Sequence, residues 1–150
     1  IIAAVHLVPL YSSADFYIDH GHFVVSAGVD HQKVQDVLRA VLVELARLKD
    51  ELVPEKELQK SKDHLIGNLI LGLETSDELA SFYGGQEILA GSIVTPPELI
   101  KKVRAVTAPE LRALANLLFK EELLNLAIIG PYKNESAFKK IFKLSSRVLR

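Results

Sequence analysis

The sequence predicts an α+β fold in which an antiparallel or mixed sheet carries several helices packed on one face. Three observations support this. Apolar stretches with strand character lie near both ends of the chain, and long segments between them repeat apolar residues every three or four positions. No regular strand–helix–strand alternation links the two kinds of element. With 150 residues, the chain is expected to form a single α+β domain, residues 1–150, with a buried core.

The composition excludes several classes of protein. The 18 basic and 19 acidic side chains leave a net charge of −1, so the basic excess of a nucleic-acid-binding surface is missing. No apolar run approaches the roughly 18 residues of a membrane-spanning helix. Cysteine is absent, which excludes disulfides and thiolate zinc sites and favours a cytoplasmic location. Methionine is also absent and the chain begins at Ile1, so we expect it to be part of a longer protein.

Two strands are expected within the first 29 residues. Residues 1–11 are rich in Val, Leu, Ile and Ala and predict the first strand. The small polar residues 12–15 predict a turn or the start of a bulged connection. Residues 16–29 predict the second strand. His20 and His22 would share one face of it, but no third ligand is nearby, so a solvated strand edge is favoured over a metal site.

Helical patterning extends from residue 30 to residue 119. Asp30 is expected to be the N-cap of an amphipathic helix of about five turns. Pro54 begins a second helix, which Gly67 and Gly72 are expected to interrupt. The apolar face of the first helix comprises Val34, Val37, Leu38, Val41, Leu42, Leu45 and Leu48.

Three threonines predict the starts of further helices. Thr75, Thr95 and Thr107 each precede a helical pattern whose first turn contains glutamate, which is typical of a capped helix start. The first of these helices should end at Gly91, the second near Ala105 and the third near residue 119.

The last part of the chain predicts one more strand and one more helix. Residues 123–129, LLNLAII, form a short continuous apolar run and predict a buried strand. Residues 137–142 predict a terminal helix with Phe138, Ile141 and Phe142 on its buried side, and residues 145–150 predict a frayed end. Because three strands are few for so many helices, partner strands are expected outside this sequence.

No catalytic motif is present. A zinc peptidase needs two histidines one helical turn apart with a glutamate beside one of them, and none of the five histidines belongs to H-E-x-x-H or H-x-x-E-H. The nucleophile-elbow and glycine-rich phosphate-binding motifs are missing as well. His64 is interpreted as an exposed helix residue. His31 beside Asp30 could act as a base with its orienting carboxylate, but Asp30 suits a helix cap better.

Four segments in order resemble the M16 (insulinase/pitrilysin, processing-peptidase-like) metallopeptidase family. The first resembles the family strand D-x-G-x-F-x-I-x-A-G, and the second the helix start V-x-x-x-E-L-x-x-A-K, with Ser61 in place of Ala. The third resembles the helix break L-x-L-E-S/D-S. The fourth resembles a V-T-x-E-D/E-[IL] helix followed by a closing strand. Together the resemblance covers about residues 16–144. The four segments are residues 19–29, 53–62, 71–76 with 82–84, and 106–111 with 124–131.

The resemblance implies a role in peptide binding. In this family two similar α+β halves enclose an unfolded peptide; one half holds zinc on an inverted H-x-x-E-H motif and the other has no metal. The chain is similar to the later part of the metal-free half. The implied partners are a peptide substrate and a zinc-bearing lobe or partner subunit. No cofactor is implied within this chain, and zinc is implied for the parent protein or a partner chain.

Tyr83 is the candidate substrate-binding residue. Many family members place an Arg and a Tyr in the metal-free half, where they hold the substrate backbone. The Arg would fall at residues 75–79, where this sequence has none, and Tyr83 is the nearest tyrosine. The alternative interpretation of Tyr83 is a helix-packing residue with its hydroxyl at the rim.

Two other functions stay open. The chain could be a non-catalytic M16-like scaffold subunit, or an unrelated α+β interaction module. The latter would be favoured if residues 16–29 and 123–129 did not share one sheet. An apolar sheet edge without partner strands would also favour a homo-oligomer.

Overall fold

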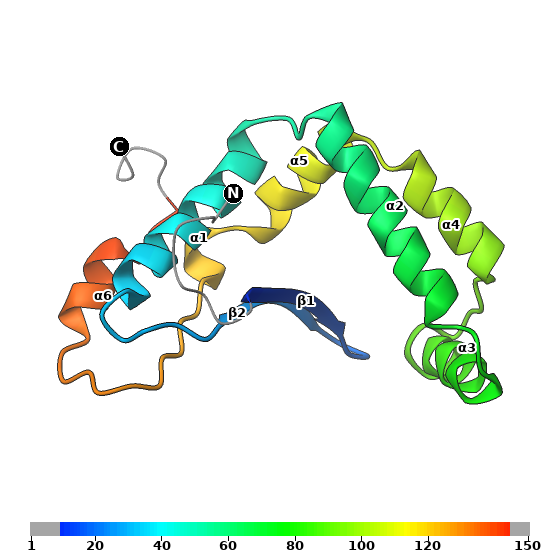
Figure 1. Cartoon of the computed structure of the whole chain (residues 1–150), viewed down its shortest axis with the longest axis horizontal. Helices are drawn as coiled ribbons and strands as arrows, with labels where there is room; N and C mark the ends of the chain where they lie inside the picture. The colour runs from blue at the N-terminus through cyan, green and yellow to red at the C-terminus, as the bar shows by residue number, and fades with distance from the viewer. Residues whose placement is uncertain (1–9, 145–150) are drawn as a thin grey trace. The chain divides into compact units, whose positions relative to one another are not determined.

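The computed structural model describes residues 10–144, which contain six α-helices, one short 3-10 helix and one two-stranded sheet (Figure 1). The predicted α+β class is therefore confirmed. Strands β1 (Leu10–Phe16) and β2 (Gly21–Ala27) pair as a hairpin, which makes them antiparallel. The predictions of a strand at residues 1–9 and of a frayed end at residues 145–150 lie outside the described residues.

The turn predicted at residues 12–15 is wrong, because these residues lie within β1. Every residue of β1 is exposed, and small polar side chains suit an exposed strand as well as a turn. The turn lies instead at residues 17–20, where the backbone N–H of Tyr17 donates to the carbonyl of His20 at 2.8 Å. The second strand is correspondingly shorter than the predicted residues 16–29.

The chain divides into two compact units. The described residues of unit 1 are 10–13, 23–52 and 111–144, and unit 2 comprises residues 14–22 and 53–110. Within the described residues, no helix combines the length and the apolarity needed to cross a bilayer.

Unit 1 is organised around α1 (Val34–Asp50), which packs against α6 (Ser136–Ile141). Two residues of the predicted apolar face of α1, Val37 and Leu42, are buried. Phe138 of α6 is buried as predicted, whereas Ile141 and Phe142 are only partly buried. The end of α1 is tied to the end of α5 (Ala108–Leu118): the Lys49 ammonium donates to the carbonyl of residue 119 at 2.7 Å, and the Asn116 amide donates to the carbonyl of Lys49 at 2.9 Å.

Asp30 is not the N-cap of α1. Lys33 occupies the N-cap position, and its side chain makes no hydrogen bond to the first turn of the helix. The Asp30 carboxylate instead accepts from the backbone N–H of Gln32 at 2.9 Å, and its carbonyl accepts from the N–H of Lys33 at 2.8 Å. Asp30 therefore stabilises a turn that precedes the helix. Such local hydrogen bonding competes with capping for the same side chain.

The prediction of a buried strand at residues 123–129 is also wrong. Residues 121–123 form the 3-10 helix η1 (Glu121–Leu123), residues 124–129 have no regular secondary structure, and Ile129 is fully exposed. An apolar run becomes a strand only when another strand accepts and donates its backbone hydrogen bonds. The sheet of the described residues contains only β1 and β2, so this segment does not share it.

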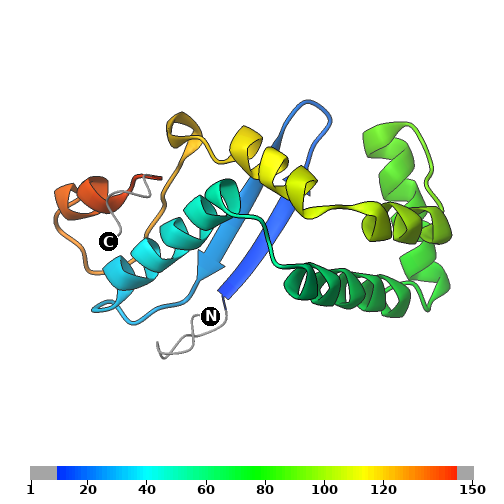
Figure 2. The ribbon, with the colours of Figure 1, turned by 90° about the horizontal axis from the view of Figure 1, so that it is seen from above.

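Unit 2 contains α2 (Glu55–Leu71), α3 (Ser76–Ala90) and α4 (Pro96–Ala105), with α2 packed against α4 (Figure 2). The Lys62 ammonium donates to the carbonyl of Arg104 at 3.0 Å, and Leu58 and Ile66 of α2 are buried. The predicted interruption at Gly67 is wrong, since α2 continues through it and ends only before Gly72.

The predicted helix starts of unit 2 are confirmed. The Thr75 hydroxyl accepts from the backbone N–H of Glu78 at 3.2 Å, and the Glu78 carboxylate accepts in return from the N–H of Thr75 at 3.0 Å. Glu98 and Glu110 accept in the same way from the N–H groups of Thr95 at 2.9 Å and Thr107 at 2.8 Å. As predicted, α3 ends at Gly91, whose φ of 60° is the left-handed conformation that glycine favours.

Candidate functional site

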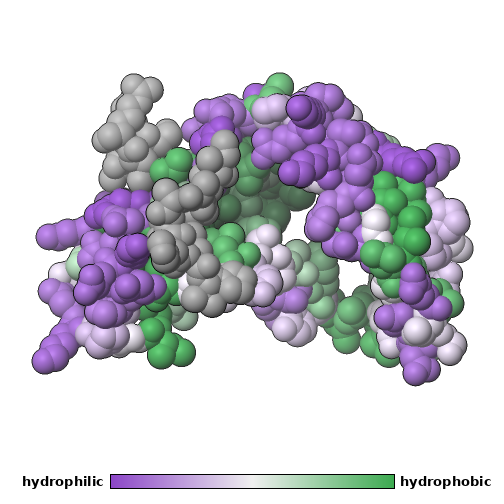
Figure 3. All heavy atoms as spheres, in the orientation of Figure 1, coloured by the Kyte–Doolittle hydropathy of each residue, from purple (hydrophilic) through white to green (hydrophobic). Residues whose placement is uncertain are grey.

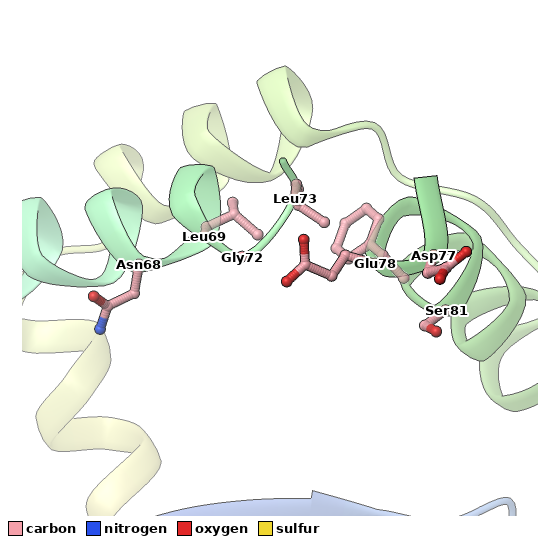
Figure 4. Close-up of a pocket in the computed structure, with 8 residues that line it drawn as sticks. Asn68, Leu69, Gly72, Leu73, Asp77, Glu78 and Ser81 are labelled. Carbon is pink, nitrogen blue, oxygen red and sulfur yellow. The ribbon is translucent and has the colours of Figure 1, made fainter. Parts of the chain in front are cut away.

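An open groove lies in unit 2 at the corner where α2 ends and α3 begins (Figure 4). The corner is the helix break at which the family resemblance would place the substrate-holding Arg, although residues 75–79 contain none. The groove is lined by Asn68, Leu69, Gly72, Leu73, Asp77, Glu78, Ser81 and Phe82.

Local interactions fix the shape of this corner. Gly72 caps the end of α2, and its N–H donates to the carbonyl of Asn68 at 2.8 Å. A Cβ at Gly72 would lie only 3.1 Å from the carbonyl oxygen of Asn68, so a side chain there would be crowded. Three residues later the capping box of Thr75 and Glu78 sets the start of α3. The sequence between the two helices therefore specifies a short and well-defined connection.

The groove has an apolar wall. Leu69, Leu73 and Phe82 line it and are each partly exposed. Around it, hydrophobic side chains come to the surface along the second half of α2, whereas hydrophilic ones cover the first half (Figure 3). The exposed apolar residues of this half are Leu65, Ile70 and Leu71, with 56%, 56% and 64% of their surface accessible. The second half of α2 therefore exposes three large apolar side chains and buries one, Ile66.

Two acidic residues, Asp77 and Glu78, are among those that line the groove. Figure 4 shows the Glu78 carboxylate directed towards Leu73 and the Asp77 side chain directed away from Leu73. Hydrogen bonds from the Thr75 hydroxyl at 2.9 Å and from its backbone N–H at 3.0 Å lower the pKa of Glu78, with the hydroxyl bond as the larger cause. The groove therefore combines apolar side chains with a fixed negative charge near neutral pH.

Tyr83, the predicted substrate-binding residue, lies beside the groove but is not one of its lining residues. It is half-buried on α3, and its ring meets the ring of Phe82 edge-on, with centroids 5.2 Å apart. Phe82, Leu69, Leu73 and Glu78 were not predicted as site residues. The L-x-L-E pattern at residues 71–74 contains Leu73 and is the sequence signal that could have identified it, whereas Glu78 belongs to the capping box of Thr75.

The two histidines of the hairpin lie on one face, as their spacing suggests. The Tyr17 ring stacks on His20 at 4.6 Å and on His22 at 5.7 Å between centroids. Each histidine also has a carboxylate neighbour: His20 lies 2.6 Å from Asp19 and His22 lies 3.2 Å from Asp15. Across residues 10–144, no group of three His, Asp or Glu side chains is arranged to hold a metal ion.

Comparison with known proteins gives a consistent set of relatives. No protein-family model matches the chain. It is 33% identical over 125 residues to YmxG of Bacillus subtilis, described as an uncharacterized zinc protease, covering 83% of this chain and 30% of that protein. It is 24% identical over 110 residues to the mitochondrial-processing peptidase subunit beta of Saccharomyces cerevisiae, covering 73% of this chain and 24% of that subunit.

The fold also has a relative among solved structures. The chain matches a chain of complex III2 from Candida albicans, determined with Inz-5 bound, with a TM-score of 0.66 and 19% sequence identity. The match covers 72% of this chain and 26% of the other, and at this identity it shows the fold alone. The chain spans about 30% of the length of the zinc protease that it matches.

Proposed function

This chain belongs to the M16 (insulinase/pitrilysin, processing-peptidase-like) metallopeptidase family, and from that premise we propose that it holds an extended peptide as a metal-free lobe. In this proposal a zinc-bearing lobe or partner subunit cleaves the peptide. The observation that carries the proposal is the match to zinc proteases over 83% of the chain, in a sequence that contains no H-x-x-E-H motif.

Residues 10–144 do not fit a zinc site, because they offer no group of three suitable ligands. We therefore assign no catalytic step to them. When bound elsewhere in the parent protein or its partner, zinc would supply an activated water. The contribution proposed for this chain is positioning: holding a flexible peptide removes part of its entropy before the reaction. The groove at the α2–α3 corner and Tyr83 beside it are the surface proposed to do this.

The second candidate function is a non-catalytic scaffold subunit. It is favoured by the fold match to a complex III protein and by the absence of an Arg at residues 75–79. The unrelated interaction module is not retained. Residues 124–129 do not pair with the hairpin, and a missing shared sheet was the observation that would favour an unrelated module. The sequence identity to a zinc protease over most of the chain outweighs it.

Peptide binding by the chain separates the lobe from the scaffold. We expect a fluorescein-labelled, unstructured Ser/Leu peptide to bind, measured by fluorescence anisotropy, and the Tyr83→Ala variant to bind several-fold more weakly. Tyr11→Ala is the matched control, because Tyr11 is 65% exposed on β1 and lies away from the groove residues in sequence and element. Absence of binding by the wild-type chain would favour the scaffold, and equal binding by both variants would remove Tyr83 from the site.

Metal and activity measurements test the metal-free assignment. The chain by itself is expected to cleave no peptide and to bind no stoichiometric zinc. Zinc retained through dialysis, and lost on replacing His20 and His22 by alanine, would contradict the assignment.

We also propose a cytoplasmic location, which the absence of cysteine supports, and a tendency to form a homo-oligomer. Phe16 and Ile18, with 73% and 80% of their surface exposed, lie at the end of the hairpin, where apolar strand edges favour association. Sedimentation over a range of concentrations measures this, and a strictly monomeric species at every concentration would count against it.

A further inference from the structure

We propose that the lysine-rich surface around α6 docks an acidic segment of a partner protein. This surface belongs to unit 1, whereas the groove belongs to unit 2, so the proposal does not depend on the peptide-holding function. We call the surface the α6 basic patch. It comprises four exposed lysines: Lys133, Lys139, Lys140 and Lys143.

Basic residues are concentrated in this part of the sequence. Residues 133–150 contain six of the 18 basic residues of the chain but only one of its 19 acidic residues, Glu135. The chain as a whole has a net charge of −1, so the concentration is local. A local excess of one charge attracts a partner of opposite charge to that place on the surface.

The packing of α6 leaves its lysines in solvent. Phe138 within α6 and Leu144 shortly after it are buried, and α6 packs against α1. Lys139, Lys140 and Lys143 are exposed, and hydrophilic side chains protrude where α6 lies in Figure 3. The apolar side of this short helix is therefore used inside unit 1, and its basic side is left for contacts with other molecules.

The backbone of the patch is anchored on both sides of α6. Before the helix, the Tyr132 hydroxyl donates to the carbonyl of His31 at 3.1 Å, and the Tyr132 ring meets the ring of Phe138 edge-on with centroids 5.1 Å apart. After the helix, the buried Leu144 holds the chain. Because the backbone is fixed, a ligand that binds the patch needs to order only the lysine side chains.

The carboxylates of the chain use little of this charge. Lys139 pairs with Glu135, with 2.7 Å between the ammonium and the carboxylate, so a carboxylate can bind at the patch. Within residues 10–144, no carboxylate forms an ion pair with Lys133, Lys140 or Lys143.

The acidic residues near the start of α1, the helix against which α6 packs, have other partners. The Asp36 carboxylate lies 3.0 Å from the guanidinium of Arg39, and the Asp30 carboxylate accepts from the backbone N–H of Gln32 at 2.9 Å. Three lysines of the patch are therefore available to carboxylates of another molecule.

An acidic protein segment suits the patch better than a bilayer or a nucleic acid. A helix that lies on a bilayer inserts its apolar face, but Phe138 and Leu144 are buried in unit 1. Single-stranded nucleic acid stacks its bases on aromatic rings, and the Tyr132 ring beside the patch is packed against Phe138. Carboxylates need only ammonium groups at neighbouring positions, which Lys140 and Lys143 offer at a spacing of three residues.

The test uses three labelled peptides of about 12 residues, too short to fold by themselves. They share one Ser/Gly sequence in which four positions are all Glu, all Gln or all Lys, and binding is measured by fluorescence anisotropy. At low ionic strength the Glu peptide should bind about tenfold more tightly than the Gln peptide, since three exposed ion pairs each contribute about twofold or more. The Lys peptide should bind most weakly, and salt should remove the difference.

Two matched triple variants assign the binding to the patch. The first replaces Lys133, Lys140 and Lys143 by glutamine and should bind the Glu peptide no more tightly than the Gln peptide. The second makes the same change in net charge and should keep the preference. It replaces three exposed lysines of unit 2: Lys56, Lys60 and Lys101. Far-UV circular dichroism should show both variants folded.

Three outcomes would overturn the proposal. Equal affinity of the wild-type chain for the Glu and Gln peptides would show that no acidic segment docks. Equal loss in both variants would assign the binding to net charge and not to the α6 basic patch. Tighter binding of an oligothymidylate of equal charge, or of vesicles made of equal parts phosphatidylcholine and phosphatidylserine, would replace the protein partner by a nucleic acid or a membrane.

The uncharged Ser/Leu peptide keeps this test apart from the proposed function. The variant that lacks Lys133, Lys140 and Lys143 should bind it as the wild-type chain does, because the groove residues are unchanged. Loss of Ser/Leu binding together with Glu binding would mean that one surface accounts for both, and would overturn a separate docking site.

Discussion

Unit 1 and unit 2 are stabilised in different ways. Six of the eight buried hydrophobic side chains of the described residues belong to unit 1, gathered around α1 and α6, whereas unit 2 buries only Leu58 and Ile66. Unit 2 instead has three Thr–Glu helix caps, and α3 has no buried residue at all. Unit 1 thus depends on contacts between distant residues, and unit 2 on hydrogen bonds between residues three apart.

The candidate site lies in unit 2, which buries fewer hydrophobic side chains than unit 1 does. A helix corner held by local bonds can keep its shape while its apolar side chains stay at the surface, available for a ligand. Unit 1 also exposes apolar side chains, among them Leu117 and Ile129, but the groove is lined by residues of unit 2. Regions of low local burial are also the ones from which binding surfaces are commonly drawn.

The largest effect is expected from Leu42→Ala in unit 1. Leu42 is 1% exposed, and removing a fully buried leucine side chain costs about 2 to 5 kcal/mol through lost burial and the cavity left behind. Urea unfolding followed by circular dichroism measures the loss. Leu48→Ala, on the same helix at a position 38% exposed, is the control and should cost clearly less. Similar losses for both would mean that α1 is not held by burial.

A smaller effect is expected from Thr75→Ala in unit 2. Losing an N-cap costs about 1 kcal/mol, and the first turn of α3 should lose protection from amide hydrogen exchange. Thr75→Ser keeps the hydroxyl that accepts from Glu78 and should retain most of that protection. Unchanged exchange in the alanine variant would show that unit 2 does not depend on its caps.

The stability of the three capped helix starts is expected to depend on pH at values below the ordinary pKa of glutamate. The bonds from Thr75, Thr95 and Thr107 lower the pKa of Glu78, Glu98 and Glu110 in the folded chain. The stabilisation is therefore complete above the unfolded pKa of about 4.3 and is lost as the pH falls through the lower folded values.

The measurement is hydrogen exchange in α3, α4 and α5 across this pH window. Replacing the three threonines by alanine should flatten the dependence. In unit 1 the pKa of Glu135 is also lowered, by its hydrogen bond and charge pairing with Lys139, so a smaller dependence is expected at α6. A dependence that persists in the triple variant would assign it to other carboxyl groups.

The smallest effect is expected from Arg47→Gln on α1. Arg47 lies 3.2 Å from Glu44 and 3.4 Å from Glu51, and all three side chains are about half exposed. Solvent screens such pairs, so the midpoint of thermal unfolding should stay within measurement error. A clear fall of the midpoint would show that surface charge, besides burial, holds unit 1.

The features that sequence predicts well in this chain are those decided within one helical turn. The starts at Thr75, Thr95 and Thr107 were predicted because the hydroxyl, the carboxylate and the N–H groups they bond all lie within four residues. The stop at Gly91 and part of the apolar face of α1 are predicted on the same local grounds, although Leu48 of that face is 38% exposed. Even here competition matters, since Asp30 forms a turn where a cap was expected.

The features that sequence predicts poorly depend on partners far along the chain. Residues 123–129 have the composition of a buried strand, but no strand of the described residues pairs with them. Residues 12–15 have the composition of a turn, yet pairing with β2 makes them a strand. The groove is a case of the same kind: Leu69 and Phe82 line one groove only because the chain turns between α2 and α3, which their helical periodicity does not show.

The sequence by itself therefore determined the class of the fold, most of the helix starts and the family to which the chain belongs, because composition, periodicity and capping are recorded in consecutive residues. Only the tertiary structure decided which apolar residues are buried, which segments pair as strands, and that Glu78 faces an apolar groove while Glu98 and Glu110 do not. The reason is physical: the three caps are alike in their local bonds, and they differ only in what other parts of the chain place beside them.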